Sequence, residues 1–257
     1  MIIQCEQLSK TYRADDTVVQ AVDDVNLDVA SGDFAVILGH SGSGKTTLLS
    51  LIGGLTSPDK GCVRIHGRDN WSSGDTYLSR LRNKTIGFIF QFASLIPTLT
   101  ALENLLLPLY FQADAAKGKD RAMSLLTEVG LADKANVYPA QLSGGQQRRI
   151  AIARAFINEP EIILADEPTG DLDEETEADI LTMFRRFHKQ GMTFLVVTHN
   201  IHLAVTQHKS RILHTILDEI FLLHNSTCDL ATPFRLRVRS AEEFAEGRRQ
   251  CPGFYDY

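Results

Sequence analysis

An apolar run leads into a glycine-rich loop at Phe34-Ala35-Val36-Ile37-Leu38-Gly39-His40-Ser41-Gly42-Ser43-Gly44-Lys45-Thr46. The last eight residues match G-x-x-x-x-G-K-[ST] and stand between a predicted strand and a predicted helix, which is the context that this pattern needs. Backbone N–H groups of such a loop surround phosphates, the lysine reaches the outer phosphates and the hydroxyl ligates Mg²⁺. The alternative is an ordinary glycine-rich turn, but such a turn needs no strand before it and no helix after it. The stretch predicts a nucleotide site on an α/β fold.

A second segment, Ile162-Ile163-Leu164-Ala165-Asp166-Glu167, ends an apolar strand with two carboxylates. The end of a strand in a parallel sheet would place Asp166 beside the glycine-rich loop, where it could hold Mg²⁺ through water. Glu167 is then suited to orient and deprotonate an attacking water. A surface Asp-Glu turn before Pro168 is the alternative. With the loop upstream, the two carboxylates favour nucleotide hydrolysis.

The order of the predicted elements indicates the fold class. Short apolar runs predict strands that helices cover on both faces, at 34–38, 86–90, 162–165 and 194–198. Helices are predicted at 45–52, 119–129, 146–157 and 176–190. This alternation predicts an α/β fold with a mainly parallel sheet. Residues 92–159 have helical periodicity and no strand run, so we interpret them as a helical insertion.

Composition limits the partners and the compartment. The 257 residues carry a net charge of −6, which argues against binding to a phosphate backbone, so nucleic acid is not an expected partner. The four cysteines are far apart, which favours a reducing cytoplasm. No run approaches the roughly 18 apolar residues of a membrane span, and the start lacks a signal-peptide pattern. We therefore expect any membrane connection to come through another chain.

A third segment, Leu142-Ser143-Gly144-Gly145-Gln146, lies between the loop and the acidic strand. This ordered set resembles the nucleotide-binding subunits of ATP-binding cassette (ABC) transporters, and the pentapeptide resembles the signature motif of that family. The resemblance implies a P-loop NTPase (RecA-like) core, an N-terminal antiparallel β portion and an inserted α-helical subdomain. It implies an ATPase domain over 1–225, with the core at 1–91 and 160–225 and the helical subdomain at 92–159. The role of the C-terminal tail, 226–257, is left open.

The resemblance also assigns site residues. It implies catalytic roles for Glu167, for the Q-loop glutamine Gln91 and for the switch histidine His199, and Mg²⁺ contacts for Thr46, Gln91 and Asp166. The residues that it assigns to ATP are Tyr12, Gly39, His40, Ser41, Gly42, Ser43, Gly44, Lys45, Thr46, Thr47, Asp166, Ser143, Gly144, Gly145 and Gln146. In a sequence without this ordered set of motifs, Tyr12 would be interpreted as a packing residue and His199 as a structural histidine. The D-loop residues Asp171 and Asp173 would be interpreted as helix caps.

The signature has a mechanical interpretation. A hydroxyl, backbone N–H groups and the dipole of a helix predicted from Gln146 converge on an anion. The family resemblance implies that this anion is ATP bound by a second subunit, packed head to tail. We therefore expect a homodimer with ATP and Mg²⁺ as cofactors, integral membrane permease partners, and a location at the cytoplasmic face of a membrane.

The segment from Gln91 to Asn104, followed by Leu107-Pro108-Leu109, resembles the export-type branch that includes LolD, MacB and FtsE. The resemblance implies an ATPase that drives export or mechanical work across a membrane. Asp171 and Asn200 depart from that branch, which usually has Asn and Asp at these places. A non-transport ABC ATPase and a regulatory ATPase of a membrane or division complex are the alternatives. The histidines His199, His202 and His208 lack the carboxylate or cysteine partners of a metal site.

Overall fold

The computed structural model describes residues 1–14, 17–111, 118–170, 172–199, 211–216 and 219–224. The tail, Asp171, Asn200, His202 and His208 lie outside the described residues, and so do the predictions made for them.

A six-stranded sheet forms the centre of the molecule, in the order β10-β9-β3-β8-β7-β6. Every neighbouring pair is parallel except β9 and β10, which confirms the predicted mainly parallel sheet. Its strands are β3 (Phe34–Leu38), β6 (Ile86–Ile89), β7 (Ile162–Asp166), β8 (Thr193–Thr198), β9 (Arg211–Ile216) and β10 (Glu219–His224).

A second, antiparallel sheet has the order β2-β1-β4-β5. Its strands are β1 (Ile3–Ala14), β2 (Thr17–Val29), β4 (Lys60–Ile65) and β5 (Arg68–Asp69). The long β1–β2 hairpin is interrupted by register shifts, which bend and twist such a ribbon. This sheet confirms the antiparallel portion that the family resemblance implied.

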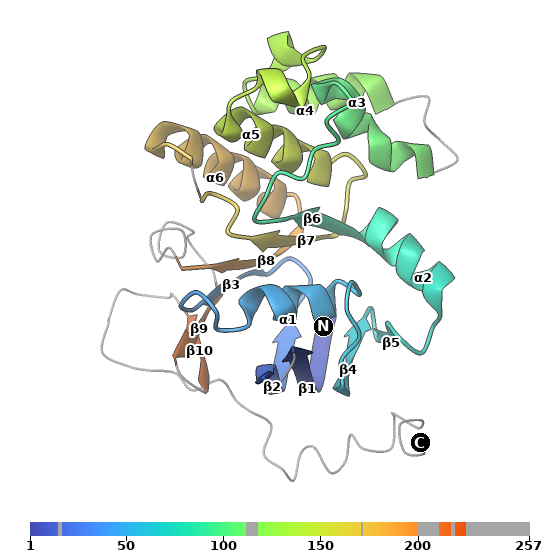
Figure 1. Ribbon diagram of the computed structural model, residues 1–257, viewed down its shortest axis with the longest axis vertical. Coiled ribbons are helices and arrows are strands. Elements are labelled where there is room, and N and C mark those ends of the chain that lie inside the picture. The colour runs from blue at the N-terminus through green and yellow to red at the C-terminus, as the bar shows by residue number, and fades with distance from the viewer. Residues whose placement is uncertain (15–16, 112–117, 171, 200–210, 217–218, 225–257) are drawn as a thin grey trace.

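Helices lie on both sides of the parallel sheet (Figure 1). Helix α1 lies between the two sheets, while α3, α4, α5 and α6 lie on the other side of the parallel sheet. The α-helices are α1 (Lys45–Ile52), α2 (Asp75–Arg80), α3 (Ala101–Leu106), α4 (Gly118–Glu128), α5 (Gly144–Ala155) and α6 (Glu174–Lys189). Shorter turns are η1 (Leu81–Thr85, a π-helix) and the 3₁₀ segments η2 (Leu107–Phe111), η4 (Ala132–Lys134) and η5 (Pro139–Gln141).

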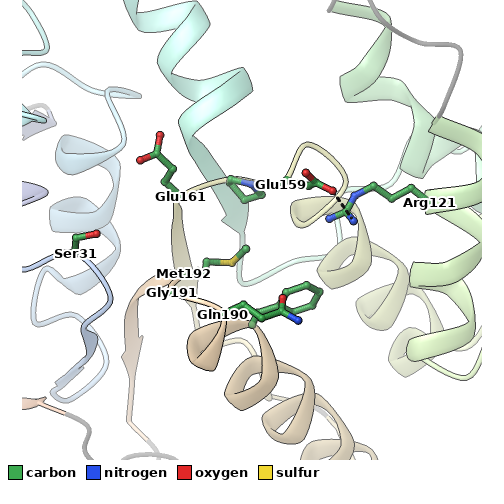
Figure 2. A pocket seen from close by; sticks show the side chains of 9 residues that line it. Ser31, Arg121, Glu159, Glu161, Gln190, Gly191 and Met192 are labelled. Atoms are coloured by element: carbon green, nitrogen blue, oxygen red, sulfur yellow. Dashed lines mark ion pairs between the residues drawn. The ribbon is translucent and has the colours of Figure 1, made fainter.

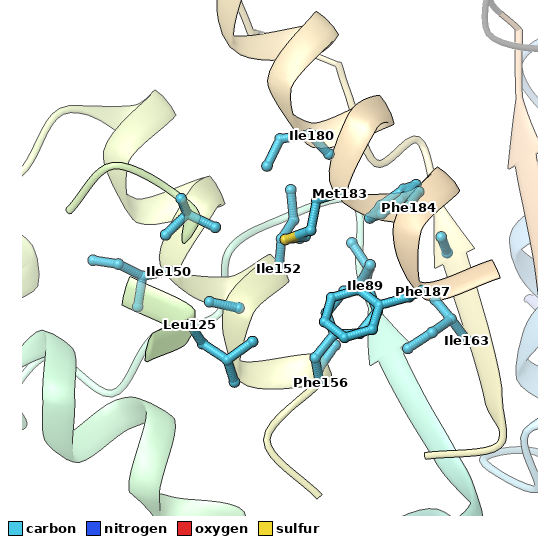
Figure 3. Close-up of a cluster of buried hydrophobic side chains, with 14 of the residues drawn as sticks. Ile89, Leu125, Ile150, Ile152, Phe156, Ile163, Ile180, Met183, Phe184 and Phe187 are labelled. Carbon is cyan, nitrogen blue, oxygen red and sulfur yellow. The ribbon is translucent and has the colours of Figure 1, made fainter. Parts of the chain in front are cut away.

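Side chains alternate between two hydrophobic cores along the parallel strands. In β3, Phe34 and Val36 face the core under α3 to α6, whereas Ala35 and Ile37 face the core around α1. Alternation to opposite faces is inherent in a strand, and a strand buried on both faces must be apolar throughout. Figure 3 shows Phe156, the C-cap of α5, packed with Phe184 and Phe187 of α6 over the sheet. Both faces of the sheet are therefore covered, and the ends of its strands remain available for a functional site.

The predicted boundaries differ from the structure in a few places. Helix α1 has the predicted bounds, whereas α5 begins at Gly144 and not at Gln146. Helix α2 and the π-helical turn after it were not predicted. Among the described residues, none of the helices has the length and apolar character needed to cross a membrane.

Candidate active site

The candidate site lies at the carboxyl edge of the parallel sheet. Strands β3, β7 and β8 run in the same direction, so the loop after β3 and the residues that end β7 and β8 meet there. The N–H of Gly39 donates to Thr198 O at 3.4 Å, and the N–H of Glu167 donates to Val197 O at 2.9 Å. Three segments that are far apart in the sequence are thereby joined at one edge.

The glycine-rich loop closes tightly on the β1–β2 hairpin. Gly44, the N-cap of α1, has φ 84°, and a Cβ there would lie 1.9 Å from Ala21 O of β2. Only glycine combines that backbone conformation with so close an approach. His40, Ser41, Gly42, Ser43 and Thr46 are exposed, whereas Gly39, Gly44 and Thr47 are half-buried. The loop therefore presents its open side to solvent.

Lys45 lies inside the loop. Its Nζ donates to Gly39 O and His40 O, both at 2.7 Å, and it contacts Ser43 Oγ at 3.4 Å. Burial lowers the pKa of Lys45, and the charges of Glu167 and Asp166 oppose that effect. The ammonium group is thus held by main-chain oxygens at the position from which a lysine of this pattern reaches phosphate.

Thr46 and Asp166 meet across the edge. The Thr46 hydroxyl donates to Oδ2 of Asp166 at 2.7 Å, and Asp166 is buried. Burial raises the pKa of Asp166, and the hydrogen bond from Thr46 opposes the shift. A hydroxyl and a carboxylate are the hard oxygen donors that Mg²⁺ prefers. These two residues therefore fit the metal role expected for them.

Glu167 is held on both carboxylate oxygens. The Thr198 hydroxyl donates to Oε2 at 2.7 Å, while the His199 N–H donates to Oε1 at 2.9 Å and the His199 Nδ1 lies 2.8 Å from the same oxygen. Glu167 also has φ 45°, which is unusual for a residue other than glycine. Such strain is found where the surroundings impose a conformation, often at functional sites. Thr198 was not among the predicted site residues, although it directly precedes His199.

Gln91 follows β6 with an exposed side chain, and its carbonyl is bound by Arg148 of α5. Arg148 also donates to the carbonyl of Glu167. The main-chain carbonyls of Gln91 and Glu167 thus accept hydrogen bonds from the same guanidinium group. Sequence reasoning missed Arg148, because main-chain carbonyls that accept from it leave no pattern in the sequence.

The signature segment caps α5. Ser143 is the N-cap, its Oγ accepting from the Gln146 N–H at 3.2 Å, and Gln146 Oε1 accepts from the Ser143 N–H at 3.0 Å. This reciprocal pair is a capping box, which explains why the helix begins at Gly144. A Cβ on Gly144 would meet nothing within 4 Å. Among the described residues, no hydrogen bond joins this segment to the glycine-rich loop.

Two further predicted residues lie nearby. Tyr12 of β1 is 43% exposed and pairs with Val19, two residues from the Ala21 that contacts Gly44. Asp173 caps α6 by accepting from the Thr176 N–H at 2.9 Å, in line with the capping alternative.

A hollow of about 410 Å³ lies at the opposite edge of the sheet (Figure 2). Ser31, Glu161 and Met192 line it, and these residues precede β3, β7 and β8. An ion pair of 2.9 Å joins Arg121 to Glu159 at its rim. Ligands of open α/β sheets bind at the carboxyl ends of the strands, so this hollow is not the candidate site.

Comparison with known proteins agrees with this geometry. A family model described as ABC transporter matches residues 22–170. The chain belongs to the ABC transporter family. It is similar to the lipoprotein-releasing system ATP-binding protein LolD of Geobacter metallireducens, with 44% identity over 208 residues that cover 79% of this chain and 91% of that protein. It is an ABC ATPase subunit.

Two other similarities extend the comparison. The macrolide export ATP-binding/permease protein MacB of Brucella abortus is 40% identical over 233 residues, which cover 90% of this chain but only 36% of that protein. A dimeric structure of a post-hydrolysis state of the ATP-binding cassette MJ0796, bound to ADP and Pi, matches with a TM-score of 0.80 and 39% identity, covering 91% of this chain and 99% of that one. The ABC fold of this chain is thereby confirmed.

Proposed function

We propose that this ABC ATPase works as a head-to-tail homodimer that hydrolyses Mg-ATP and drives export or mechanical work across a membrane. The observation that carries the proposal is the double hold on Glu167 by Thr198 and His199, because it keeps a carboxylate in one conformation at the edge where its charge acts on Lys45 and Asp166, and this supports a general-base role. The similarity to LolD supports the export branch.

Each residue has a defined role in this proposal. Lys45 and the N–H groups of the loop bind the phosphates, and Tyr12 stacks on the adenine. Thr46, Asp166 and Gln91 would hold Mg²⁺, and the bound ion would neutralise charge on the phosphates. Glu167 accepts the proton of the water that attacks the γ-phosphorus, as the bond from that phosphorus to the ADP oxygen breaks. His199 and Thr198 keep the carboxylate in place.

The second subunit supplies the signature. Gly144 and Gly145 begin α5 with N–H groups that have no intrahelical acceptor, and the helix dipole adds positive charge at the same end. Within one chain this segment makes no hydrogen bond to the glycine-rich loop among the described residues. A second copy, related by a two-fold axis, can bring each signature against the ATP of the other.

Exposed apolar side chains support a membrane permease as a further partner. Phe92, directly after Gln91, is 75% exposed, and Tyr110 and Phe111 at the end of η2 are 67% and 77% exposed. Exposed apolar side chains that form a contiguous patch mark interaction surfaces, and we propose that these three aromatic residues contribute to such a patch. The permease would hold the ATPase at the cytoplasmic face of the membrane.

The substitution Glu167→Gln tests the proposal. It should lower ATP turnover by about 10²–10⁴-fold, the range for loss of a general base, while ATP binding persists and ATP produces a dimer in size-exclusion chromatography with light scattering. Glu174→Gln, an exposed residue in the first turn of α6, is the matched control and should behave like the parent. Turnover per molecule that does not fall on dilution would overturn the dimer mechanism.

A further inference from the structure

Arg148 is a buried cation in the second turn of α5, with only 6% of its surface exposed. Burying a guanidinium group is unfavourable unless its donors find acceptors. Here the acceptors are main-chain carbonyls: Arg148 donates to those of Phe90 at 2.6 Å, Asp166 at 3.3 Å and Pro168 at 3.3 Å, and also to those of Gln91 and Glu167.

These carbonyls belong to two different loops. Phe90 and Gln91 follow β6, whereas Asp166, Glu167 and Pro168 end β7 and follow it, and β6 and β7 are neighbours in the sheet. A guanidinium group is planar and presents five donors in a fixed fork. It therefore sets the distance and orientation of one loop relative to the other, which a flexible ammonium group could not do.

The main chain of Glu167 depends on this contact. Two hydrogen bonds flank its φ angle of 45°. The Glu167 N–H donates to Val197 O, and the Glu167 carbonyl accepts from Arg148. Thr198 and His199 hold the carboxylate, but Arg148 holds the peptide from which the side chain projects. A strained conformation persists only where its surroundings over-determine it.

Helix α5 connects this arrangement to the signature. Ser143, the N-cap, is five residues before Arg148, which is about 7 Å along a helix axis. Arg154, further along the same helix, donates to the carbonyls of Ala93 and Ser94, both at 3.1 Å. The segment after β6 is thus bound to α5 at two places.

We propose that Arg148 is a positioning residue that fixes Gln91 and Glu167 relative to each other and to the first turn of α5. A displacement of Gln91 at one ATP site is then passed to the signature segment that the same subunit presents to its partner. This inference rests on the proposed head-to-tail ATPase function, and it assigns no contact between Arg148 and ATP.

Kinetics of Arg148→Met and Arg148→Lys form the first test. We expect Arg148→Met to lower kcat about tenfold or more, equal to about 1.4 kcal/mol, with KM changed less than about threefold because the loop that binds phosphate is untouched. Arg148→Lys should restore part of kcat, since an ammonium group can bind some of these carbonyls.

Arg121→Met is the matched control. Arg121 also donates to two main-chain carbonyls, those of Phe156 at 2.8 Å and Ile157 at 3.0 Å, but at the far end of α5. It should lower the melting temperature and leave kcat within about twofold of the parent, a change below about 0.5 kcal/mol. An equal loss of kcat in both variants would assign the effect to general loosening of α5 and overturn the inference.

Hydrogen exchange provides a readout that does not depend on turnover. Without nucleotide, Arg148→Met should exchange faster at the amides of Glu167 and Gly170, while Arg121→Met should not. Adding AMP-PNP with Mg²⁺ to monomeric protein should change exchange at the Gln146 amide in the parent and not in Arg148→Met. Unchanged exchange at Glu167 and Gly170, or an equal AMP-PNP response at Gln146 in both proteins, would overturn the inference.

The parent and Glu167→Gln are measured alongside. If the parent has no turnover, or Glu167→Gln turns over like the parent, the proposed function fails, and hydrogen exchange still decides the role of Arg148. If both behave as proposed while Arg148→Met keeps the parent kcat, the Arg148 inference alone fails.

Discussion

The hydroxyl of Thr46 donates a hydrogen bond of 2.7 Å to Oδ2 of Asp166, a residue 120 positions later in the chain. The contact joins the start of α1 to the end of β7 and keeps a carboxylate in a largely buried place. Burial raises the pKa of Asp166, which means that its charged form is less favourable in the folded protein than in the unfolded chain.

Asp166→Asn should therefore stabilise the protein while it abolishes turnover. In the pH interval between the ordinary pKa of Asp166 and its raised pKa, the folded state binds more protons than the unfolded state. The folded protein therefore loses stability from this group as the pH rises through that interval. The amide avoids that loss, and the melting temperature should be higher than that of the parent at pH 7. The gain should shrink as the pH falls through that interval. Scanning fluorimetry from pH 7 to pH 4 measures it, and a melting temperature below that of the parent at pH 7 would contradict it.

Thr198→Val should lower kcat and leave ATP affinity unchanged. The variant keeps the shape of the side chain but removes the donor to Glu167 Oε2, and a hydrogen bond to a charged group contributes about 1.5–3 kcal/mol. We expect a loss in kcat of about tenfold or more, measured by steady-state kinetics with calorimetric ATP titration.

Thr193→Val is its control on the same strand. The Thr193 hydroxyl accepts from the Gly32 N–H at 2.9 Å, at the other end of β8. This variant should lose stability but keep the parent kcat. A loss of turnover as large as that of Thr198→Val would show that β8, and not Glu167, is being disturbed.

Gly44→Ala should be much more damaging than Gly42→Ala. Both glycines have positive φ, 84° and 83°, so each alanine costs roughly 1–2 kcal/mol in backbone strain. Only at Gly44 would the new methyl group meet Ala21 O at 1.9 Å, while at Gly42 it meets nothing within 4 Å. The clash should add about 1–3 kcal/mol. Urea unfolding of both variants gives the difference, and equal destabilisation would contradict this packing.

Ser143→Ala should show whether Ser143 only caps helix α5 or also contributes to ATP turnover as part of the signature. Loss of an N-cap costs about 0.5–2 kcal/mol. Thr100→Ala removes the same kind of capping box, with Glu103, from α3 and should destabilise the protein similarly. Only Ser143→Ala should also reduce turnover, by about tenfold or more, with ATP affinity of the monomer unchanged. Parallel thermal unfolding and ATPase assays compare them, and full activity of Ser143→Ala would remove Ser143 from the partner's site.

Much of the core was predictable because local and tertiary preferences agree there. Helix α1 has the predicted bounds because the glycine-rich loop, the helix start and the apolar face all lie in one short stretch, Gly39 to Ile52. The start of α5 was misplaced because two glycines, poor helix formers, follow the cap, although Ser143 and Gln146 carry the capping-box pattern.

Arg148 and Thr198 were not predictable in the same way. The acceptors of Arg148 are carbonyl groups 57 residues before it and 19 residues after it, and every residue type has a carbonyl. Thr198 was expected only as the end of a strand, since its partner Glu167 directly follows the neighbouring strand and is brought opposite by the sheet register. Contacts that arise from register or from main-chain atoms become visible only in the folded chain.

The close approach of Gly44 to Ala21 has a consequence for selectivity. Tyr12 is on the same hairpin as Ala21, so the hairpin connects this aromatic ring to the phosphate loop. In the proposed function, in which Tyr12 stacks on the base and the loop binds the phosphates, the hairpin limits the separation between these two binding points. A nucleotide whose base and phosphates are spaced differently should then bind more weakly.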